Sequence, residues 1–235
     1  MIRLDGIRAI TLDLDDTLWP VKPVLLHAEQ VMRDWLRPRA PRAEQALAEG
    51  RYRIEDIRRK HPDQSHDMGW IRRQLLTTVL LACSEDPALA DLAFDIFLAA
   101  RQQVQPWPDV AEVLAVWAKR YRIAALTNGN ADIYRTPLGT YFTASISASQ
   151  FGVAKPDARI FHAACEALDV PPQQTLHIGD DWVLDVRGAR EAGLHAVWLV
   201  RSGLETQFVV KTMNVSEPAA RPFFSMYDID DVLKK

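Results

Sequence analysis

The half of the chain that follows Pro108 alternates short apolar segments with amphipathic ones, and this alternation constrains the fold most strongly. The apolar segments predict strands, which fall at residues 122–127, 142–148, 175–178 and 195–200. The amphipathic segments predict helices, which fall at residues 109–120, 157–168 and 182–192. A further apolar run, at residues 7–14, predicts a strand near the start of the chain. Strands that alternate with helices form βαβ units, so we expect an α/β fold built on a parallel sheet.

Residues 24–104 follow a helical pattern and contain no convincing strand. The first stretch, from Val24 to Leu36, carries its apolar residues on one wide helix face. Three more helical stretches follow, at residues 42–60, 66–83 and 87–104. We therefore expect an all-helical domain of residues 20–105, inserted into a core of residues 1–19 and 106–235. In that core, the sequence predicts irregular structure at residues 202–221 and a short strand and helix at residues 223–235.

The charge of the chain argues against a nucleic-acid partner. Its 235 residues carry a formal net charge of -3, and its densest group of cations, at residues 51–60, is interleaved with Glu55 and Asp56. The two cysteines, Cys83 and Cys165, lie in apolar surroundings without CxxC spacing, which indicates reduced thiols. The sequence has no signal-peptide pattern and no apolar run long enough to cross a membrane, so we expect a cytoplasmic protein without a membrane partner.

Polar side chains follow three of the predicted strands. They occur in the segments Asp13-Leu14-Asp15, Thr127-Asn128-Gly129 and Gly179-Asp180-Asp181. In open parallel sheets, ligands bind just beyond the carboxyl ends of the strands. Three segments that are distant in the sequence are therefore expected to meet at one site.

The acidic residues of these segments suit phosphoryl chemistry. Asp13 can act as a nucleophile, because carboxylates form covalent phosphoryl intermediates. Asp15 can donate a proton to the leaving oxygen and later accept one from water. Clustered carboxylates repel one another unless a cation lies between them, and magnesium prefers oxygen ligands. We expect the side chains of Asp13 and Asp180 and the backbone carbonyl of Asp15 to hold magnesium. We expect Asp185 either to bind the ion itself or to hold the residues that bind it. We expect Asp181 to cap a helix.

A second group of residues suits the binding of a phosphate group. The Thr127 hydroxyl and the backbone amides of Asn128 and Gly129 can donate hydrogen bonds to phosphate oxygens. Lys155 precedes a predicted helix, and its ammonium can balance the charges of the phosphate and of Asp13. An Asp-x-Asp segment alone is equally typical of a turn, and a lone lysine is usually a surface residue. The inference therefore depends on the whole set of residues.

Four short motifs occur in a fixed order, and together they resemble those of the haloacid dehalogenase superfamily. The motifs are Asp13-Leu14-Asp15-Asp16-Thr17-Leu18, Leu126-Thr127-Asn128-Gly129, Lys155-Pro156-Asp157, and Gly179-Asp180-Asp181 with Asp185. The resemblance implies a Rossmann-like core with a helical C1-type cap. The implied nucleophile is Asp13, and the implied general acid/base is Asp15. The implied phosphate-binding residues are Thr127 and Lys155, and the implied magnesium ligands are Asp13, Asp15 and Asp180, with Asp185 in support.

A finer resemblance points to the phosphatases of the flavin pathway. It is carried by residues 15–19 with Pro23-Val24, by residues 127–131 and by residues 176–181. Those phosphatases act on FMN and on 5-amino-6-(5-phospho-D-ribitylamino)uracil. The resemblance therefore implies a small phosphorylated metabolite as the substrate. The helical cap sets substrate choice in the superfamily, and in this chain it carries no motif that identifies the substrate.

Other functions are compatible with parts of this pattern. A 2-haloacid dehalogenase would also use Asp13 as its nucleophile, but its halide leaves unprotonated and needs no acid at Asp15. A phosphomutase would return the phosphoryl group from Asp13 to a sugar, so an assay for free phosphate against isomerised product separates it from a phosphatase. A non-enzymatic class remains: a phosphorylation switch or a phosphorylation-dependent interaction protein. The switch has no use for a large helical insert, and a silent interaction protein would usually lack a motif residue.

Overall fold

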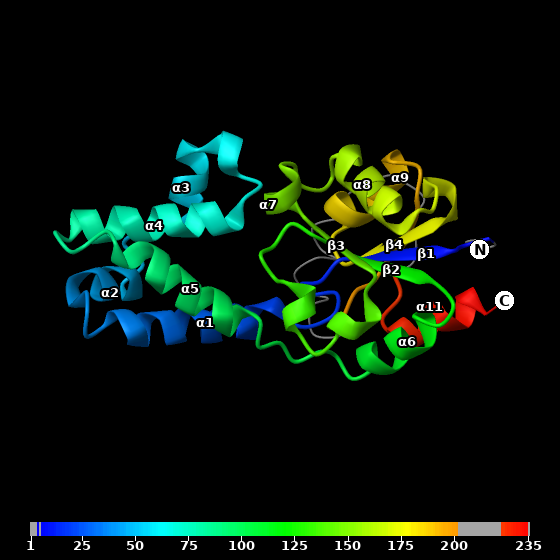
Figure 1. Cartoon of the computed structure of the whole chain (residues 1–235), viewed down its shortest axis with the longest axis horizontal. Helices are drawn as coiled ribbons and strands as arrows, with labels where there is room; N and C mark the ends of the chain where they lie inside the picture. The colour runs from blue at the N-terminus through cyan, green and yellow to red at the C-terminus, as the bar shows by residue number, and fades with distance from the viewer. Residues whose placement is uncertain (1–3, 5, 202–221, 235) are drawn as a thin grey trace.

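The core of the molecule is a parallel sheet. In the computed structural model, which describes residues 4, 6–201 and 222–234, the sheet contains five strands in the order β3-β2-β1-β4-β5. The bounds are Ala9–Leu12 for β1, Arg122–Thr127 for β2, Ala144–Ser147 for β3, Thr175–Gly179 for β4 and His195–Trp198 for β5. All neighbouring strands run parallel. The predicted α/β fold is therefore confirmed (Figure 1).

The strand order brings the start of the chain to the centre of the sheet. The strand β1 lies between β2 and β4, and its four residues are fully buried. After β1 the chain builds β2 and β3 on one side, and it then returns to build β4 and β5 on the other side. Such a reversal opens a crevice at the carboxyl ends of the strands. The polar segments that follow β1, β2 and β4 lie at this edge of the sheet.

Helices cover both faces of the sheet (Figure 1). On one face, Ile10, Leu12 and Ile123 pack with residues of α6 (Val110–Trp117) and α11 (Met226–Leu233). On the other face, Leu126 packs with α8 (Ala158–Leu168) and with α9 (Gly188–Glu191). The shorter helical segments are η2 (Ile133–Arg135), η3 (Gly139–Tyr141), α7 (Ala148–Phe151), η4 (Pro172–Gln174) and the π-helical η5 (Trp182–Arg187). Successive side chains of a strand point to opposite faces of the sheet, so these largely buried strands pack against a layer of helices on each face.

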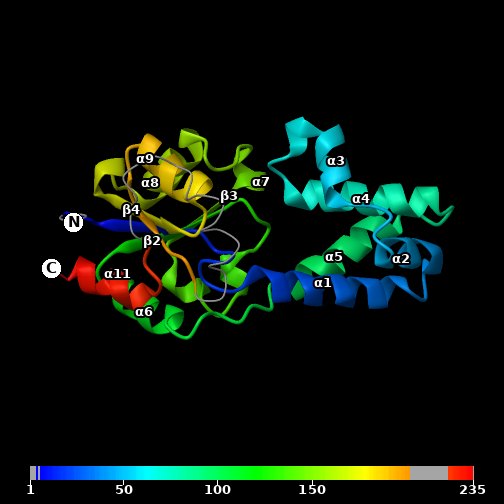
Figure 2. The same cartoon turned by 180° about the vertical axis from the view of Figure 1, so that it is seen from behind.

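The segment between β1 and β2 is helical, and we call it the helical insert. It contains α1 (Val21–Leu36), α2 (Pro41–Ala48), α3 (Ile54–Lys60), η1 (Pro62–Gln64), α4 (Met68–Ala82) and α5 (Leu89–Arg101). The helix α5 packs against both α1 and α4. The insert has its own apolar cluster, which includes Leu36, Ile71 and Phe97. It extends away from one end of the sheet (Figure 2).

Two predictions of secondary structure were wrong in detail. The single helix expected at residues 42–60 is divided into α2 and α3, because Gly50 adopts a φ of +66° and ends the first helix. The strand expected after residue 222 is reduced to one bridge between Leu199 and Phe223. The stretch expected to be irregular, residues 202–221, lies outside the described residues. None of the helices in the described part of the chain is both long and apolar enough to span a membrane.

Candidate active site

Asp13 is the first polar residue after β1, and it lies at the centre of the site. Its backbone amide donates to the Ile178 carbonyl at 2.9 Å, which continues the pairing of β1 with β4. Asp13 is only 8% exposed, and its Oδ1 accepts a hydrogen bond from Lys155 Nζ at 2.6 Å. Thr17 Oγ1 lies 3.4 Å from the other oxygen, Oδ2. A buried cation therefore holds this carboxylate at the carboxyl end of the central strand.

Lys155 joins Asp13 to Asp185. Its Nζ donates to one oxygen of each carboxylate, in both cases at 2.6 Å, and the lysine is buried. Burial alone would lower the pKa of Lys155, but the two carboxylates outweigh burial and raise it. His177 Nε2 lies 3.1 Å from the same Asp185 oxygen, and burial lowers the pKa of His177. The lysine is thus held in its charged form beside the nucleophile candidate.

Asp13, Asp180 and Asp185 form a carboxylate cluster. One oxygen from each of the three lies within 4.8 Å of the others. Burial raises the pKa of Asp13 to about 7, although Lys155 opposes the shift. Burial, followed by the charges of Asp13 and Asp185, also raises the pKa of Asp180 well above its usual value. Carboxylates in such a position need protons or a cation, and their oxygens fit a hard divalent cation such as magnesium.

Asp185 and Asp181 support the arrangement around this cluster. Both Asp185 oxygens accept hydrogen bonds from the protein: Oδ1 from Lys155 Nζ and Oδ2 from the Asp181 amide at 3.0 Å. Asp181 Oδ1 accepts from the amides of Val183 and Leu184, each at 2.8 Å, and so caps η5. The predicted capping role of Asp181 is confirmed. Asp185 lies behind Lys155 and orients it.

Asp15 lies on the loop that leads from β1 into the helical insert. Trp19 closes this loop through a β-bridge with Asp15, and its Nε1 donates to Asp15 Oδ1 at 2.9 Å. Between them, Asp16 has a left-handed φ of +59°, and its side chain accepts from the Val21 amide at 2.9 Å. Arg101 Nη2, from α5, lies 2.5 and 2.6 Å from the two Asp15 oxygens. Asp15 is therefore fixed between the core and the insert.

The segment after β2 borders Asp15. Thr127 is buried, and its Oγ1 accepts from the Gly129 amide at 2.9 Å. A Cβ at Gly129 would lie 2.8 Å from Asp15 Oδ2, so this close approach requires glycine. The Asn128 side chain holds the backbone of Lys155, accepting from its amide at 2.8 Å and donating to its carbonyl at 3.0 Å. The Asn128 side chain is thus engaged with Lys155, and the phosphate-binding role expected of the Asn128 backbone amide stays a prediction.

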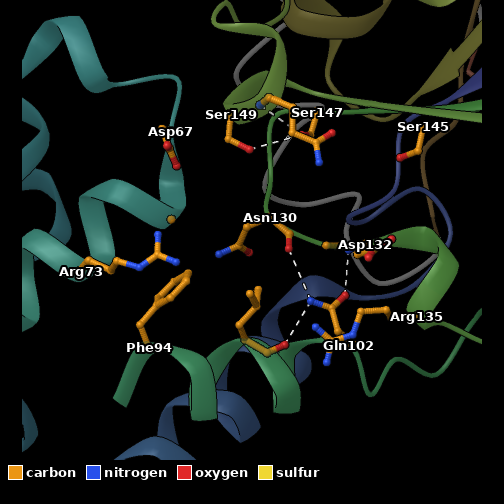
Figure 3. Close-up of a pocket in the computed structure, with 14 residues that line it drawn as sticks. Asp67, Arg73, Phe94, Gln102, Asn130, Asp132, Arg135, Ser145, Ser147 and Ser149 are labelled. Carbon is orange, nitrogen blue, oxygen red and sulfur yellow. Dashed lines mark hydrogen bonds between the residues drawn. The ribbon is translucent and has the colours of Figure 1, made fainter. Parts of the chain in front are cut away.

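A polar cleft of about 350 Å³ opens between the insert and the core (Figure 3). The residues labelled on its walls are Asp67, Arg73, Phe94, Gln102, Asn130, Asp132, Arg135, Ser145, Ser147 and Ser149. The Arg73 guanidinium covers the ring of Phe94 at 4.0 Å. Gln102 ties the end of α5 to the loop after β2, because it donates to the Asn130 carbonyl at 3.5 Å and accepts from the Asp132 amide at 2.8 Å. The cleft thus has the character of a site for a hydrophilic molecule.

The structure brings the sequence-predicted residues together at one edge of the sheet. Asp13, Lys155, Asp180 and Asp185 form one contact group, and the side chains of Asp15 and Thr127 both lie next to Gly129. The sequence pattern did not identify Arg101. Arg101 is the last residue of a helix that lies far from every motif in the sequence. A basic residue in the last turn of a helix is common and gives no sign of a functional role.

Comparisons with known proteins agree with this geometry. The family model described as haloacid dehalogenase-like hydrolase matches residues 7–193. The chain is 32% identical to the 5-amino-6-(5-phospho-D-ribitylamino)uracil phosphatase YigB of Escherichia coli over 83% of this chain and 84% of that protein. It is 30% identical to a phosphoserine phosphatase of Thermus thermophilus over 70% of this chain and 64% of that protein.

Solved structures show the same fold. A structure described as a 2-haloacid dehalogenase from Pseudomonas syringae matches with a TM-score of 0.83 and 31% identity, and the match covers 97% of this chain and 98% of that one. A phosphatase structure from Thermococcus onnurineus matches with a TM-score of 0.66 and 22% identity, over 97% of this chain and 98% of that one. The second likeness concerns the fold alone.

Proposed function

The chain belongs to the haloacid dehalogenase-like hydrolase family, and from this premise we propose that it is a phosphatase that hydrolyses a small phosphomonoester with magnesium through a phosphorylated Asp13. One observation carries the proposal: the buried Asp13 carboxylate is paired with Lys155 and lies beside Asp180 and Asp185. Carboxylates form acyl phosphates, and a lysine beside a cation site offsets the charge of a phosphate dianion.

The reaction has two steps in this proposal. In the first, an oxygen of Asp13 attacks phosphorus, the bond from phosphorus to the ester oxygen breaks, and Asp15 gives a proton to the departing oxygen. In the second, water attacks the same phosphorus, Asp15 takes a proton from that water, and the Asp13 carboxylate is regenerated. The Thr127 hydroxyl and the Asn128 amide hold the phosphoryl oxygens, while the Gly129 amide donates to Thr127 Oγ1 and orients the hydroxyl.

The carboxylate cluster fits the proposed magnesium ion. The side chains of Asp13 and Asp180 and the backbone carbonyl of Asp15 would hold it, whereas both oxygens of Asp185 accept hydrogen bonds from protein groups. When bound, magnesium supplies positive charge next to the phosphoryl oxygens.

For the substrate, we propose the phosphate ester of a polyhydroxylated alcohol, with 5-amino-6-(5-phospho-D-ribitylamino)uracil as the first candidate and FMN as the second. Two observations support this order. The Escherichia coli relative bears the name of the first compound. The cleft between the insert and the core includes Asn130, which follows Gly129 in the chain, and is lined by hydroxyl, amide and charged side chains. Its aromatic ring, Phe94, is covered by Arg73, which leaves little apolar surface for a flavin ring.

A phosphate-release screen with magnesium tests the proposal. The panel contains the ribitylaminouracil phosphate, FMN, sugar phosphates, nucleotides and p-nitrophenyl phosphate. We expect the highest kcat/KM for the first compound and loss of activity in excess chelator. Arg135→Gln, which changes a wall of the cleft, should raise KM for the preferred compound and leave p-nitrophenyl phosphate unaffected. Release of phosphate in excess chelator would refute the metal requirement, and equal rates on all esters would refute the substrate assignment.

A second candidate function is dehalogenation, because the Pseudomonas syringae structure carries the name 2-haloacid dehalogenase at 31% identity. Halide ions leave without a proton, so the acid at Asp15 favours a phosphate ester. An ion-selective measurement of halide release from 2-chloropropionate separates the two functions. We expect no release above the level of an Asp13→Asn variant.

A further inference from the structure

Arg201 follows β5 and lies buried next to the loop after β1. It is only 4% exposed, and its Nη1 donates to both oxygens of Asp109, at 2.9 and 2.7 Å. Asp109 is buried as well, and it also accepts from the Met226 amide at 2.7 Å. Asp109 immediately precedes α6, and Met226 begins α11. The Arg201 guanidinium is therefore fixed by a carboxylate that lies at the starts of two core helices.

A second contact of Arg201 reaches the backbone of the loop after β1. Its Nε donates to the Thr17 carbonyl at 2.9 Å, and this hydrogen bond is buried. The next carbonyl, that of Leu18, accepts from the Trp107 amide at 3.0 Å, and the Arg201 guanidinium lies over the Trp107 ring at 5.8 Å. A buried carbonyl needs a donor, so these contacts hold the chain at residues 17 and 18 from outside the loop.

The side chain of Thr17 faces the carboxylate cluster. Its Oγ1 donates to Asp180 Oδ1 at 2.9 Å and lies 3.4 Å from Asp13 Oδ2. Thr17 is fully buried, and its hydroxyl is separated from the backbone by a single stiff rotatable bond. The place of the hydroxyl therefore depends on the place of the Thr17 backbone, which Arg201 holds.

We propose that Arg201 is a positioning residue of the active site. It holds the Thr17 backbone so that the Thr17 hydroxyl orients Asp180 for the proposed magnesium ion, and Asp109 fixes the guanidinium in the required place. The inference rests on the phosphatase function proposed above. It adds a residue outside the four motifs that sets the affinity for magnesium without touching the ion or the substrate. Groups that orient metal ligands commonly change metal affinity by about tenfold to a hundredfold.

The test compares Arg201→Gln and Arg201→Lys with the parent enzyme. The readouts are a calorimetric titration of magnesium without substrate and the magnesium concentration for half-maximal activity. Arg201→Gln should weaken magnesium binding by about tenfold or more, because a neutral amide cannot hold both Asp109 and the Thr17 carbonyl. Arg201→Lys should fall between the parent and Arg201→Gln, since it keeps the charge and loses the planar fork. KM at saturating magnesium should stay close to that of the parent.

Thr17→Val tests the middle of this chain of contacts. The substitution removes the hydroxyl and leaves the backbone carbonyl to Arg201. It should weaken magnesium binding as the Arg201 variants do. In the Thr17→Val background, Arg201→Lys should add little, because both residues act on Asp180 through the same hydroxyl. Fully additive effects would overturn the inference, and so would parent-like magnesium affinity in Thr17→Val.

Arg72→Gln provides the matched control. Arg72 is about as buried as Arg201, but it lies in the helical insert and pairs with Glu29. Its loss should disturb packing without changing the magnesium titration, and an equal loss of affinity would assign the effect to stability and overturn the inference. Arg201→Gln that is folded by circular dichroism and binds magnesium as tightly as the parent would also overturn it. If Arg201→Gln does not fold, Arg201→Lys decides by the same criterion.

The parent enzyme separates this inference from the proposed function. If the parent binds no magnesium, or releases no phosphate from any ester, the proposed function fails and the inference fails with it. If the parent binds magnesium and releases phosphate while the Arg201 variants bind magnesium normally, only the inference fails.

Discussion

Asp13 lies between groups that act on its charge in opposite directions. Burial raises its pKa to about 7, and Lys155 favours the ionised form through a hydrogen bond of 2.6 Å. A nucleophile must be ionised to attack, so the site requires further positive charge. The proposed magnesium ion and the phosphate-binding groups would complete that balance. The buried carboxylate of Asp13 thus explains why the site needs a cation, and its position makes Asp13 the candidate nucleophile.

The raised pKa of Asp13 predicts how pH affects the metal-free protein. The folded state holds a proton on Asp13 up to about pH 7, whereas an unfolded chain releases it near the ordinary value of 3.8. The stabilising effect of this proton is therefore present at low pH and lost as pH rises through about 7. The proposed magnesium ion would replace the proton, so the increase in Tm on adding magnesium should be larger at pH 8 than at pH 5.5, by ~3 °C or more. A thermal-shift series with and without magnesium measures it, and an equal increase at both pH values would contradict the prediction.

Gly129 gives a second prediction at the scale of a residue. The Cβ of an alanine there would lie 2.8 Å from Asp15 Oδ2 and 3.3 Å from Thr127 Oγ1. Since Arg101 and Trp19 hold Asp15, its carboxylate cannot move aside without losing a partner. We expect Gly129→Ala to lower kcat by roughly tenfold to a hundredfold, with little change in Tm. Steady-state kinetics and a melting curve check this, and turnover at the parent rate would show that Asp15 is not needed in its present position.

At the scale of elements, the start of η5 gives different roles to two aspartates that are neighbours in the sequence. Asp181 caps the segment, whereas Asp180 faces the carboxylate cluster and accepts from Thr17 Oγ1 at 2.9 Å. Asp181→Ala should cost about 1 kcal/mol of stability, or ~2–4 °C in Tm, and leave the magnesium requirement unchanged. Asp180→Asn should raise the magnesium concentration for half-maximal activity by about tenfold or more. Magnesium titrations of the two variants serve as controls for each other, and a raised requirement in Asp181→Ala would contradict the assignment.

The elements also show how much of the fold and of the site could be predicted from the sequence. The strands and their polar ends were predictable, because apolar runs rich in β-branched residues that end in acids are typical of buried strands with polar loops. Residues 9–12 and 175–179 form two such strands and lie next to each other in the sheet. The break at Gly50 was not evident, since apolar spacing continues across it. Arg101 could not be predicted as part of the site. Its role depends on how α5 docks on the core, and helix docking leaves no local signal in the sequence.

At the scale of the whole molecule, the insert and the sheet have separate apolar clusters. Leu76 belongs to the cluster of the insert, and Leu176 to the cluster that packs on the sheet. We therefore propose that residues 20–105 form a domain of their own. Leu76→Ala should cost about 2–5 kcal/mol and speed amide exchange mainly in α1, α4 and α5. Leu176→Ala, equally buried, should speed exchange in the strands. Hydrogen-exchange mass spectrometry measures both, and uniform acceleration across the chain in either variant would contradict a separate domain.

The central claim is that Asp13 carries the phosphoryl group during turnover, and a trapping experiment tests it most directly. The magnesium-loaded enzyme is mixed with p-nitrophenyl phosphate, quenched in acid within the first turnovers and digested for mass spectrometry. We expect a phosphorylated peptide with the modification on Asp13. We expect no such peptide in Asp13→Asn, whose turnover should fall by at least about a thousandfold with the fold retained. Turnover by the parent with Asp13 unmodified at every quench time, or undiminished turnover by Asp13→Asn, would contradict the claim.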